Sequence, residues 1–557
     1  MLHVTLYGIT MYQNLSYTFG ASSTPLLGET IGQNLKRTVA MYPKNDAIVS
    51  LSQNFKCDYE TLWQLTTQVA KGLIAKGIQK GDRVGIWSPN RYEWTILQYA
   101  TARIGVILVN INPAYRTNEL IYVINQSGLR MMVSPLEFKT SDYKKMLKKA
   151  ARECSHLEQT IFFEQDWDQL LQLAELVSNE ALETIESSVQ FDEPVNLQYT
   201  SGTTGFPKGV TLSHHNILNN GYFIGHRLHY TEKDRVCIPV PFFHCFGMVI
   251  GNLACTTHGA CMVIPSESFE ANQALKAVQI EKCTSLYGVP AMFIAMLQTP
   301  EFDKFDLKSL RTGVMAGSPC PVEIMKQVQS KMYMREVSIC YGMTETSPVS
   351  TQTKIGVPLE KQVSTVGTIQ DHLEIKIINP DTGEIVPKGT SGELCTRGYS
   401  VMLKYWNNPE ATHQVLDDAG WMHTGDLAQM DEEGYINITG RIKDVIIRGG
   451  ENISPREIEE FLYTHEWIED VQVIGVPDEK LGEAIMAWVK LKKNAPVTSD
   501  DLLQFCQDQI AHYKIPKYWK FVESFPMTVS GKVRKVEMRE ISIEELNLQQ
   551  LLKIKTS

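Results

Sequence analysis

The sequence predicts an α/β fold: a large N-terminal domain of parallel α/β sheets plus a small β-rich subdomain, followed by a small C-terminal α/β domain. The length of 557 residues exceeds the usual size of one domain. Between residues 236 and 298, short apolar runs alternate with helical patterns, which indicates a mostly parallel sheet with helices on both faces. From about residue 365 to 440 short strands and turns replace this pattern, and further strands and helices follow.

The composition is that of a globular protein, with 43% hydrophobic and 21% charged residues. A net charge of -10 provides no basic field for nucleic acid. Eleven cysteines without a C-x-x-C pair predict reduced thiols in a cytoplasmic compartment and argue against a disulfide framework or a zinc site. We identify no signal peptide pattern and no apolar run of about 18 residues, so a transmembrane segment is not expected. Peripheral membrane contact, the oligomeric state and the choice between Met1 and Met11 as the native start stay open.

The first third of the chain is predicted to be scaffold. Residues 61–75 predict a helix that ends near Gly77, and residues 83–88 and 106–110 predict strands. Residues 130–190 are charged, rich in helical patterns and without a motif. Further along, the same rules predict strands at 236–240, 260–264 and 285–287 and helices at 271–281 and 291–298. Ligands of such sheets bind at the carboxyl ends of the strands.

A loop rich in glycine and hydroxyl residues follows the apolar run 195–199 and precedes Ser213, a predicted helix N-cap. We interpret this order as strand, loop, helix. Backbone N–H groups, hydroxyls and one lysine in such a loop can converge on a phosphate, although the spacing is not that of a Walker loop. The alternative is an ordinary surface loop. The residues predicted to bind phosphate are Thr200, Ser201, Gly202, Thr203, Thr204, Gly205 and Lys208.

Three further segments follow predicted strands. In the first, His244 lies among aromatic residues, where a packing role is the alternative to catalysis. The second runs over 314–319, where small residues allow a flat ring to approach the backbone, or form a tight turn; its candidates are Gly317, Ser318 and Pro319. The third follows the strand-like run 337–340, and its candidates are Tyr341, Gly342, Thr344 and Glu345.

In this third segment Glu345 offers the hard oxygen ligand that Mg²⁺ prefers, and Thr344 can donate to a phosphate oxygen. A helix cap is the alternative for these residues. Strands at 373–378 and 392–397 then indicate the β-rich subdomain. Asp426 comes after them and can accept two hydrogen bonds from vicinal hydroxyls of a ribose, or occupy a turn.

We predict two domains, 1–440 and 441–557. Ser454 and Glu457 match a capping box with Pro455 at the first helical position, so a helix is expected to begin there. Strands at 471–476 and 485–491 and a helix at 500–510 complete a separate α/β pattern. Lys532 follows a Ser-Gly turn near the end, and composition alone predicts a solvated basic loop.

The motifs at 199–209, 316–319, 341–348, 392–402, 443–452 and 512–517 occur in an order that resembles the adenylate-forming enzymes: acyl-CoA synthetases, luciferases and peptide-synthetase adenylation domains. The resemblance runs from about residue 25 to 545. Within this family the sequence is most similar to the medium-chain fatty acyl-CoA ligases of the type called acyl-CoA synthetase family member two.

The resemblance implies an ATP-dependent ligation of a medium- to long-chain fatty acid to coenzyme A through an acyl-AMP intermediate, with Mg²⁺. It implies that His244 lines the carboxylate pocket, that residues 316–319 pack against adenine, and that Lys532 contacts the substrate carboxylate and the α-phosphate. Asp426 and Arg441 would hold the ribose. Lys443 matches the hinge of a mobile C-terminal domain, and Gly449 and Gly450 match the coenzyme A channel.

Other functions stay open. An acyl-AMP ligase, an enzyme that adenylates aryl or short-chain acids, or a luciferase-like oxygenase would share the first step. A non-catalytic nucleotide sensor would share only the fold, but the set Lys208, Glu345, Asp426, Arg441 and Lys532 argues against it. No Gly-x-Ser-x-Gly motif supports an α/β-hydrolase. The sequence does not reveal the acyl chain length or the pathway.

Overall fold

The computed structural model describes residues 14–200, 207–318, 320–449, 451–507, 509–528 and 533–551. The chain forms two compact units. The large unit comprises Thr18–Ile375 and Thr396–Met422, and the small unit comprises Met1–Tyr17, Lys376–Cys395 and His423–Ser557. The predicted boundary at residue 440 lies within the small unit and remains a proposal.

A seven-stranded sheet of the large unit has the order β21-β11-β10-β5-β4-β6-β9. The strands β10, β5, β4, β6 and β9 are parallel, whereas β11 is antiparallel to both of its neighbours. Their bounds are β4 (Arg83–Trp87), β5 (Ile107–Ile111), β6 (Met131–Ser134), β9 (Gln159–Phe162), β10 (Pro194–Thr200), β11 (Lys208–Ser213) and β21 (Lys404–Tyr405).

A nine-stranded sheet of the same unit has the order β18-β17-β16-β15-β14-β12-β13-β2-β3. The six strands from β16 to β2 are parallel, and the edge strands are antiparallel. The bounds are β2 (Asp46–Ser50), β3 (Phe55–Asp58), β12 (Arg235–Cys237), β13 (Cys261–Ile264), β14 (Ser285–Gly288), β15 (Thr312–Ala316), β16 (Glu336–Tyr341), β17 (Thr351–Gln352) and β18 (Thr368–Ile369).

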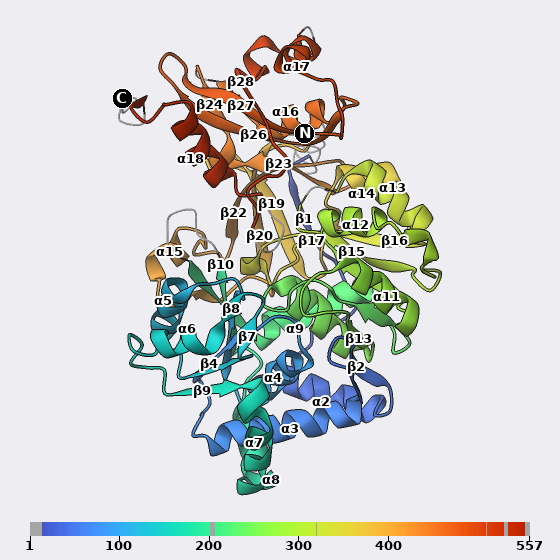
Figure 1. Cartoon of the computed structure of the whole chain (residues 1–557), viewed down its shortest axis with the longest axis vertical. Coiled ribbons are helices and arrows are strands. Elements are labelled where there is room, and N and C mark those ends of the chain that lie inside the picture. The colour runs from blue at the N-terminus through green and yellow to red at the C-terminus, as the bar shows by residue number, and fades with distance from the viewer. Residues whose placement is uncertain are drawn as a thin grey trace, which may run out of the picture. The chain divides into compact units, whose positions relative to one another are not determined.

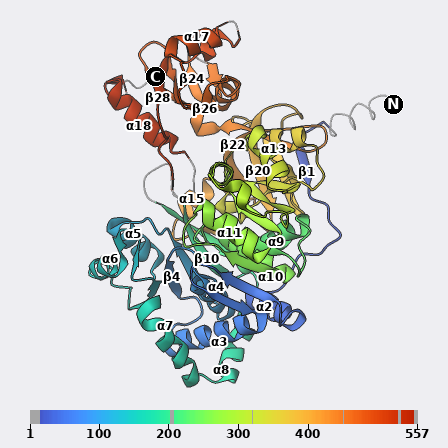
Figure 2. The same cartoon turned by 45° about the vertical axis from the view of Figure 1, so that its right-hand side comes forward.

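Helices cover both faces of each large sheet, as predicted. Inner faces of both sheets share one core with α2 (Ile31–Met41), α3 (Tyr59–Ala75), α4 (Tyr92–Arg103), α9 (His214–Arg227), the π-helix η2 (Phe246–Leu253) and α10 (Ala254–His258). The outer face of the nine-stranded sheet packs on α11 (Ala271–Glu281), α12 (Pro290–Leu297) and α13 (Val322–Lys331). The outer face of the seven-stranded sheet packs on α5 (Thr117–Ser127) and α6 (Tyr143–Ala150), which lie beside β4 in Figures 1 and 2.

Shorter or peripheral helices complete the large unit. They are α7 (Phe163–Gln172), α8 (Asn179–Ser188), α14 (Leu359–Ser364) and α15 (Pro409–His413), with single turns η1 (Leu173–Leu176), η3 (Phe302–Lys304) and η4 (Thr344–Thr346). Leu35, Leu73 and Trp94 are fully buried on α2, α3 and α4. In the described part of the chain no helix has the length and apolar character to cross a bilayer.

The β-rich segment predicted for 365–440 supplies β19, β20, β22 and β23 of a five-stranded sheet with the order β1-β19-β20-β22-β23. The bounds are β1 (Tyr17–Phe19), β19 (Leu373–Ile378), β20 (Gly392–Gly398), β22 (Met422–Met430) and β23 (Ile436–Arg441). A separate hairpin joins β7 (Glu137–Phe138) and β8 (Ser141–Asp142).

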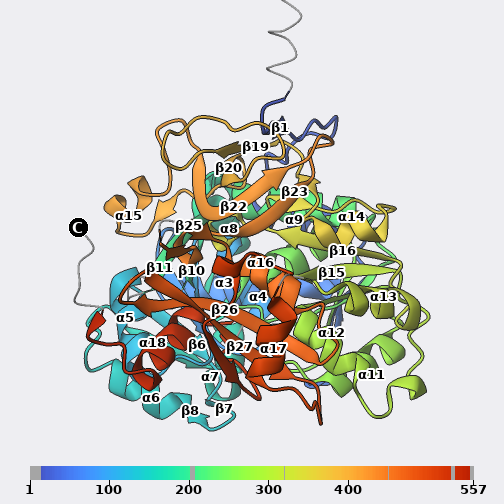
Figure 3. The same cartoon turned by 90° about the horizontal axis from the view of Figure 1, so that it is seen from above.

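The carboxy-terminal segment forms its own sheet, with the order β25-β24-β27-β26 and β28 paired to β27. One face packs on α16 (Pro455–Leu462) and α17 (Ser499–Cys506), and the other on α18 (Lys535–Glu545); Figure 3 shows these helices around β26 and β27. This is the predicted small α/β pattern. The strands are β24 (Ile446–Arg448), β25 (Glu451–Ile453), β26 (Ile468–Asp478), β27 (Gly482–Leu491) and β28 (Tyr518–Phe521), with turns η5 (Ile442–Asp444) and η6 (His512–Lys514).

Two local predictions were wrong. The predicted order strand, loop, helix misses β11, which pairs with β10 so that Thr200 lies opposite Lys208; the loop is therefore the tip of a hairpin. Ser213 does cap α9, as predicted. At α16 Pro455 lies in the first turn as expected, but Ser454 makes no side-chain cap, because its hydroxyl donates to the carbonyl of Thr439 at 2.6 Å.

Candidate active site

The candidate residues of the large unit follow neighbouring strands of the nine-stranded sheet. His244 comes after β12, Gly317 after β15, and Tyr341 ends β16. Because β12, β14, β15 and β16 are adjacent and parallel, their carboxyl ends meet at one edge of the sheet. The structure therefore brings the three predicted segments to the same edge.

Glu345 lies in the turn η4 and is only 6% exposed. Its Oε1 accepts a hydrogen bond from the hydroxyl of Tyr405 at 2.8 Å, and its carbonyl accepts one from Met402 N–H at 2.9 Å. Burial, followed by the Glu345 charge, raises the pKa of Tyr405. Thr344 is buried, and the hydroxyl of Thr346 accepts from Met343 N–H at 3.0 Å. The segment thus has the capping geometry and also presents a fixed buried carboxylate.

Lys208 approaches the same tyrosine from the hairpin. Its Nζ lies 4.9 Å from the centroid of the Tyr405 ring, which is within the range of a cation–π contact. Strand pairing explains the proximity, because Val210 of β11 lies opposite Tyr405 of β21. The sequence predicted Lys208 and Glu345 as site residues but gave no sign that Tyr405 joins them.

Hydrogen bonds hold the residues on either side of the hairpin loop. The Tyr199 hydroxyl bonds to Gln126, and the Tyr122 hydroxyl donates to the carbonyl of Pro207 at 3.0 Å. Thr200, the first predicted phosphate ligand, ends β10. The other loop candidates, Ser201, Gly202, Thr203, Thr204 and Gly205, lie outside the described residues.

His244 lies two residues before the π-helix η2. Its Nδ1 accepts from Phe246 N–H at 3.1 Å, and its carbonyl accepts from Gly247 N–H at 3.0 Å and Met248 N–H at 3.1 Å. Because Nδ1 accepts the hydrogen bond from Phe246, the proton of the neutral ring is assigned to Nε2. His244 is half-buried, so the packing role and a role at the site are both compatible with its position. A π-helix is rare and often marks a functional site.

Two buried amides hold this segment against the seven-stranded sheet. The Cys245 thiol donates to Gln198 Oε1 at 3.2 Å, and Asn110 Nδ2 donates to the carbonyl of Phe243 at 3.3 Å. Gln198 lies on β10, two residues before the hairpin loop. Our sequence reasoning missed both amides, although polar residues inside apolar strands were a usable signal.

Gly317 and Gly342 allow close approaches of the backbone. Gly317 has φ +96° and is exposed, and a Cβ there would lie 3.1 Å from Val289 Cγ1. A Cβ on Gly342 would lie 1.9 Å from the carbonyl oxygen of Pro348, so no other residue fits. Ser318 is exposed next to Gly317, and Pro319 lies outside the described residues.

The candidate ribose residues lie in the small unit. Asp426 on β22 faces Arg441 on β23, and Arg441 Nε lies 2.9 Å from Asp426 Oδ1. Asp426 is 6% exposed, whereas the Arg441 side chain is 60% exposed. The structure thus brings these two predicted residues together.

The remaining candidates of the small unit lie beyond β23. Lys443 is exposed in the turn η5. Gly449 has φ +61° and donates its N–H to the carbonyl of Leu481 at 2.8 Å. Gly450 and Lys532 lie outside the described residues.

Comparison with known proteins identifies the class of protein. Residues 35–406 match the AMP-binding enzyme family, and residues 457–532 match the AMP-binding enzyme C-terminal domain. The chain therefore belongs to the AMP-binding enzymes, which confirms the resemblance predicted from its motifs.

Individual relatives cover nearly the whole chain. It is 46% identical to the YngI protein of Bacillus subtilis, over 94% of this chain and 99% of that protein. It is 42% identical to the medium-chain acyl-CoA ligase ACSF2, mitochondrial, of Danio rerio, over 96% of this chain and 91% of that protein. Among solved structures, ATP-bound MatB from Rhodopseudomonas palustris is 26% identical, with a TM-score of 0.80, and the match covers 93% of this chain and 100% of MatB.

Proposed function

We propose that this chain is an ATP-dependent fatty acid–CoA ligase acting on medium- to long-chain acids. In this reaction the carboxylate attacks the α-phosphorus of ATP and releases pyrophosphate, and the thiol of coenzyme A then displaces AMP from the acyl-AMP. The observation that carries the proposal is the buried Glu345, held by Tyr405 beside Lys208, in an AMP-binding enzyme closely related to a medium-chain acyl-CoA ligase.

The Glu345 side chain is suited to bind Mg²⁺. It is a buried carboxylate with one oxygen held by Tyr405, and an ionised carboxylate has further lone pairs for a hard cation. Mg²⁺ bound there would neutralise charge on the leaving pyrophosphate. Tyr405 would fix the carboxylate orientation, and Lys208 adds a positive charge over the ring of the same tyrosine.

The hairpin loop supplies donors to the phosphates. The backbone and hydroxyl groups of residues 200–205, with Thr344, would donate to phosphate oxygens. Lys532 would offset charge at the α-phosphate. Preorganised donors of this kind act where charge develops in the transition state.

The remaining candidate residues are proposed to contact the fatty acid, the adenine, the ribose and coenzyme A. His244, whose Nδ1 accepts from Phe246 N–H, would border the fatty acid carboxylate. Residues 317–319 with Tyr341 and Gly342 would border the adenine, and Asp426 would accept from the ribose hydroxyls. We place the hinge of the carboxy-terminal domain (441–557) at Lys443 and the coenzyme A channel at Gly449 and Gly450.

The state of the cysteines agrees with the reducing compartment that the sequence predicts. None of the eleven, all of which lie in the described part of the chain, forms a disulfide, and all but Cys320 are buried. We therefore retain the cytoplasmic expectation for this chain, although the ACSF2 relative is named as mitochondrial.

The test is pyrophosphate release across saturated acids from C4 to C18, plus benzoate, with and without coenzyme A, with products identified by mass spectrometry. We expect a coenzyme A-dependent maximum at medium or long chains and acyl-CoA as the product. Acyl-AMP that accumulates despite coenzyme A would favour an acyl-AMP ligase. A maximum with benzoate or C4 would overturn the substrate class, and nucleotide binding without pyrophosphate would overturn the enzyme assignment.

A further inference from the structure

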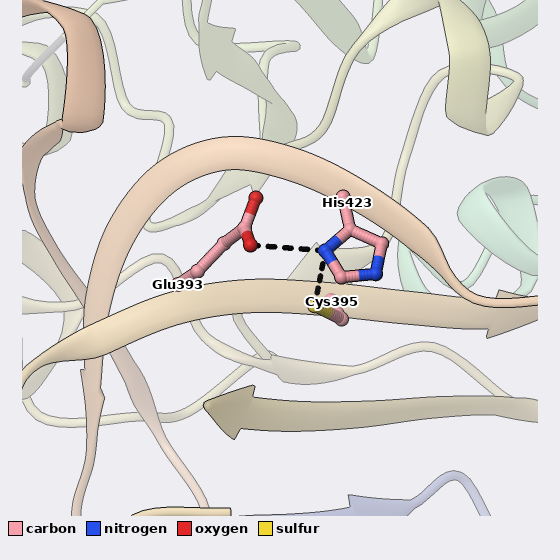
Figure 4. Close-up of side chains that lie close together, drawn as sticks. All are labelled: Glu393, Cys395 and His423. Carbon is pink, nitrogen blue, oxygen red and sulfur yellow. Dashed lines mark hydrogen bonds and ion pairs between the residues drawn. The ribbon is translucent and has the colours of Figure 1, made fainter. Parts of the chain in front are cut away.

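Three metal-ligating side chains converge on one point of the five-stranded sheet. Glu393 and Cys395 lie two residues apart on β20, so their side chains share one face, and His423 reaches them from the adjacent strand β22 (Figure 4). His423 Nδ1 lies 2.9 Å from Glu393 Oε2 and 3.6 Å from Cys395 Sγ. One ligand atom from each residue lies within 4.8 Å of the other two.

We propose that Glu393, Cys395 and His423 bind a transition metal ion of the Zn²⁺ class, with water as the fourth ligand. Tetrahedral zinc has bonds of about 2.0–2.3 Å to oxygen, nitrogen and sulfur. Such bonds put neighbouring ligand atoms about 3.3–3.6 Å apart. The observed distances differ from this by a few tenths of an ångström, which side-chain rotation can supply.

One ring nitrogen of this cluster faces two further potential ligand atoms. The Nδ1 atom of a histidine carries either one proton or one lone pair, which points along a single direction in the ring plane. Here that one atom faces both a carboxylate oxygen and a sulfur. A cation between the three atoms would be bound by one ligand atom from each residue, with the thiol proton released to solvent on binding.

The surroundings of the cluster suit a metal site. The second oxygen of Glu393 accepts from Gly425 N–H at 3.1 Å, which orients the carboxylate as supporting hydrogen bonds orient metal ligands. Cys395 and Glu393 are buried, while the His423 side chain is 31% exposed and gives a path for the ion and its water.

The chemistry of the ligands separates this site from the proposed magnesium site. Thiolate and imidazole ligands select zinc-like ions, whereas Mg²⁺ prefers oxygen ligands such as the carboxylate of Glu345. The absence of a C-x-x-C pair led the sequence interpretation away from zinc. The proposed ligands differ from such a motif because they come from two strands, β20 and β22, and not from one knuckle.

The site also lies close to a predicted substrate residue. His423 precedes Asp426 on β22 by three positions, and the Asp426 N–H donates to Thr424 Oγ1 at 3.1 Å. Metal ligation would cross-link β20 to this stretch of β22.

The test uses the metal-free, full-length protein titrated with Co²⁺, followed by displacement with Zn²⁺. We expect one equivalent to produce the charge-transfer absorption of a thiolate–cobalt bond, and Zn²⁺ to remove it. Cys395→Ser should abolish this band, and Glu393→Gln and His423→Gln should each weaken binding by more than about 100-fold, since even the loss of a supporting residue costs 10–100-fold. Zn²⁺ should also raise the Tm of the native protein but not of Cys395→Ser.

The matched control is Cys506→Ser, which removes a buried thiol from the α17 core and should keep the band. Circular dichroism checks that each variant folds, and Glu393→Gln is the conservative variant that preserves volume. Absence of the band from the native protein would overturn the proposal. A band that persists in Cys395→Ser, or Co²⁺ binding unchanged in both Glu393→Gln and His423→Gln, would do the same.

Discussion

The two units hold their candidate groups in different ways. In the large unit Glu345 is buried and bonded to Tyr405, and Lys208 lies against the same ring. In the small unit the Arg441 side chain is largely exposed, and Lys443 lies on an exposed turn. Among the candidate residues that the structure describes in this unit, Asp426 alone is buried, with Arg441 as an ion-pair partner.

This difference teaches where the protein fixes its geometry in advance. Groups held by buried partners need little reorganisation when charge develops, which supports the proposal that the large unit stabilises the phosphoryl transition state. Exposed charges are less constrained by their surroundings, which would suit the proposed domain that serves two half-reactions in succession. The following substitutions test this contrast, beginning with the largest expected effect.

Lys532→Ala should cause the largest loss. If Lys532 acts only at the α-phosphate, adenylation loses about 3 kcal/mol of transition-state stabilisation, on the order of 100-fold in rate. Conversion of supplied acyl-AMP to acyl-CoA should continue at nearly the native rate. The two half-reactions are measured separately by pyrophosphate release and by thioester formation.

Lys535→Ala is the matched control for this change. Lys535 lies in the same segment, but its Nζ is paired with Glu459 at 2.6 Å, so its loss should affect stability and not adenylation. Equal losses in both half-reactions of Lys532→Ala would contradict a lysine that serves only one step.

Tyr405→Phe should rank second, because it removes the partner of Glu345 without touching the carboxylate. Loss of a residue that orients a metal ligand costs about 10–100-fold in metal affinity. We therefore expect the Mg²⁺ concentration for half-maximal activity to rise by that factor, with little change in the KM for fatty acid. The measurement is a Mg²⁺ titration of pyrophosphate release at saturating ATP.

Tyr399→Phe provides the control, since this buried tyrosine packs against Phe223. Its Mg²⁺ dependence should match that of the native protein. An unchanged Mg²⁺ dependence in Tyr405→Phe would remove the main support for fixed geometry in the large unit.

The pairing of Glu345 with Tyr405 also marks a limit of sequence reasoning. The alternation of strands and helices predicted the parallel sheets, and the helix predicted at 271–281 has the bounds of α11. Local signals also found the cap at Ser213. Such predictions succeed because periodicity and capping depend on neighbours in the chain.

Contacts between distant residues gave no such signal. Tyr405 meets Glu345 across 60 positions, and Cys245 meets Gln198 across 47. Ser454 matched a capping box, yet a carbonyl on β23 competes for its hydroxyl. Strand β11 was missed because its apolar residues are few and its pairing partner β10 decides its conformation. Motif order predicted a set of candidate site residues but not the contacts that hold them.

His214 tests the buried interior of the large unit by pH. Burial lowers the pKa of His214 to about 3, whereas an unfolded histidine titrates near 6.5. Between these values the unfolded chain binds one more proton, so stability from this group is complete above about pH 6.5 and is lost as the pH falls. The expected slope is about 1.4 kcal/mol per pH unit.

In the native protein Ile31 N–H donates to His214 Nδ1 at 3.2 Å. His214→Asn removes the titrating group, while the amide oxygen of the asparagine can still accept this hydrogen bond. We expect the midpoint of urea unfolding to depend less on pH between 4 and 6 than in the native protein. The exposed His156→Asn is the control and should leave the dependence as it was. A native-like slope in His214→Asn would show that this interior does not set the acid stability.

Arg441→Gln should have the smallest effect. The ion pair with Asp426 is partly solvated, and exposed pairs contribute roughly 0.2–1 kcal/mol, so stability should change by less than about 1 kcal/mol. The KM for ATP should rise by less than about tenfold, because Asp426 keeps its place on β22 and can still accept from a ribose. Arg397→Gln, in a pair with Glu374 at 2.9 Å, is the matched control for loss of a surface guanidinium and should leave the KM for ATP unchanged. A loss in Arg441→Gln as large as that in Tyr405→Phe would mean that the exposed arginine is as firmly organised as the buried carboxylate, and the contrast between the two units would fail.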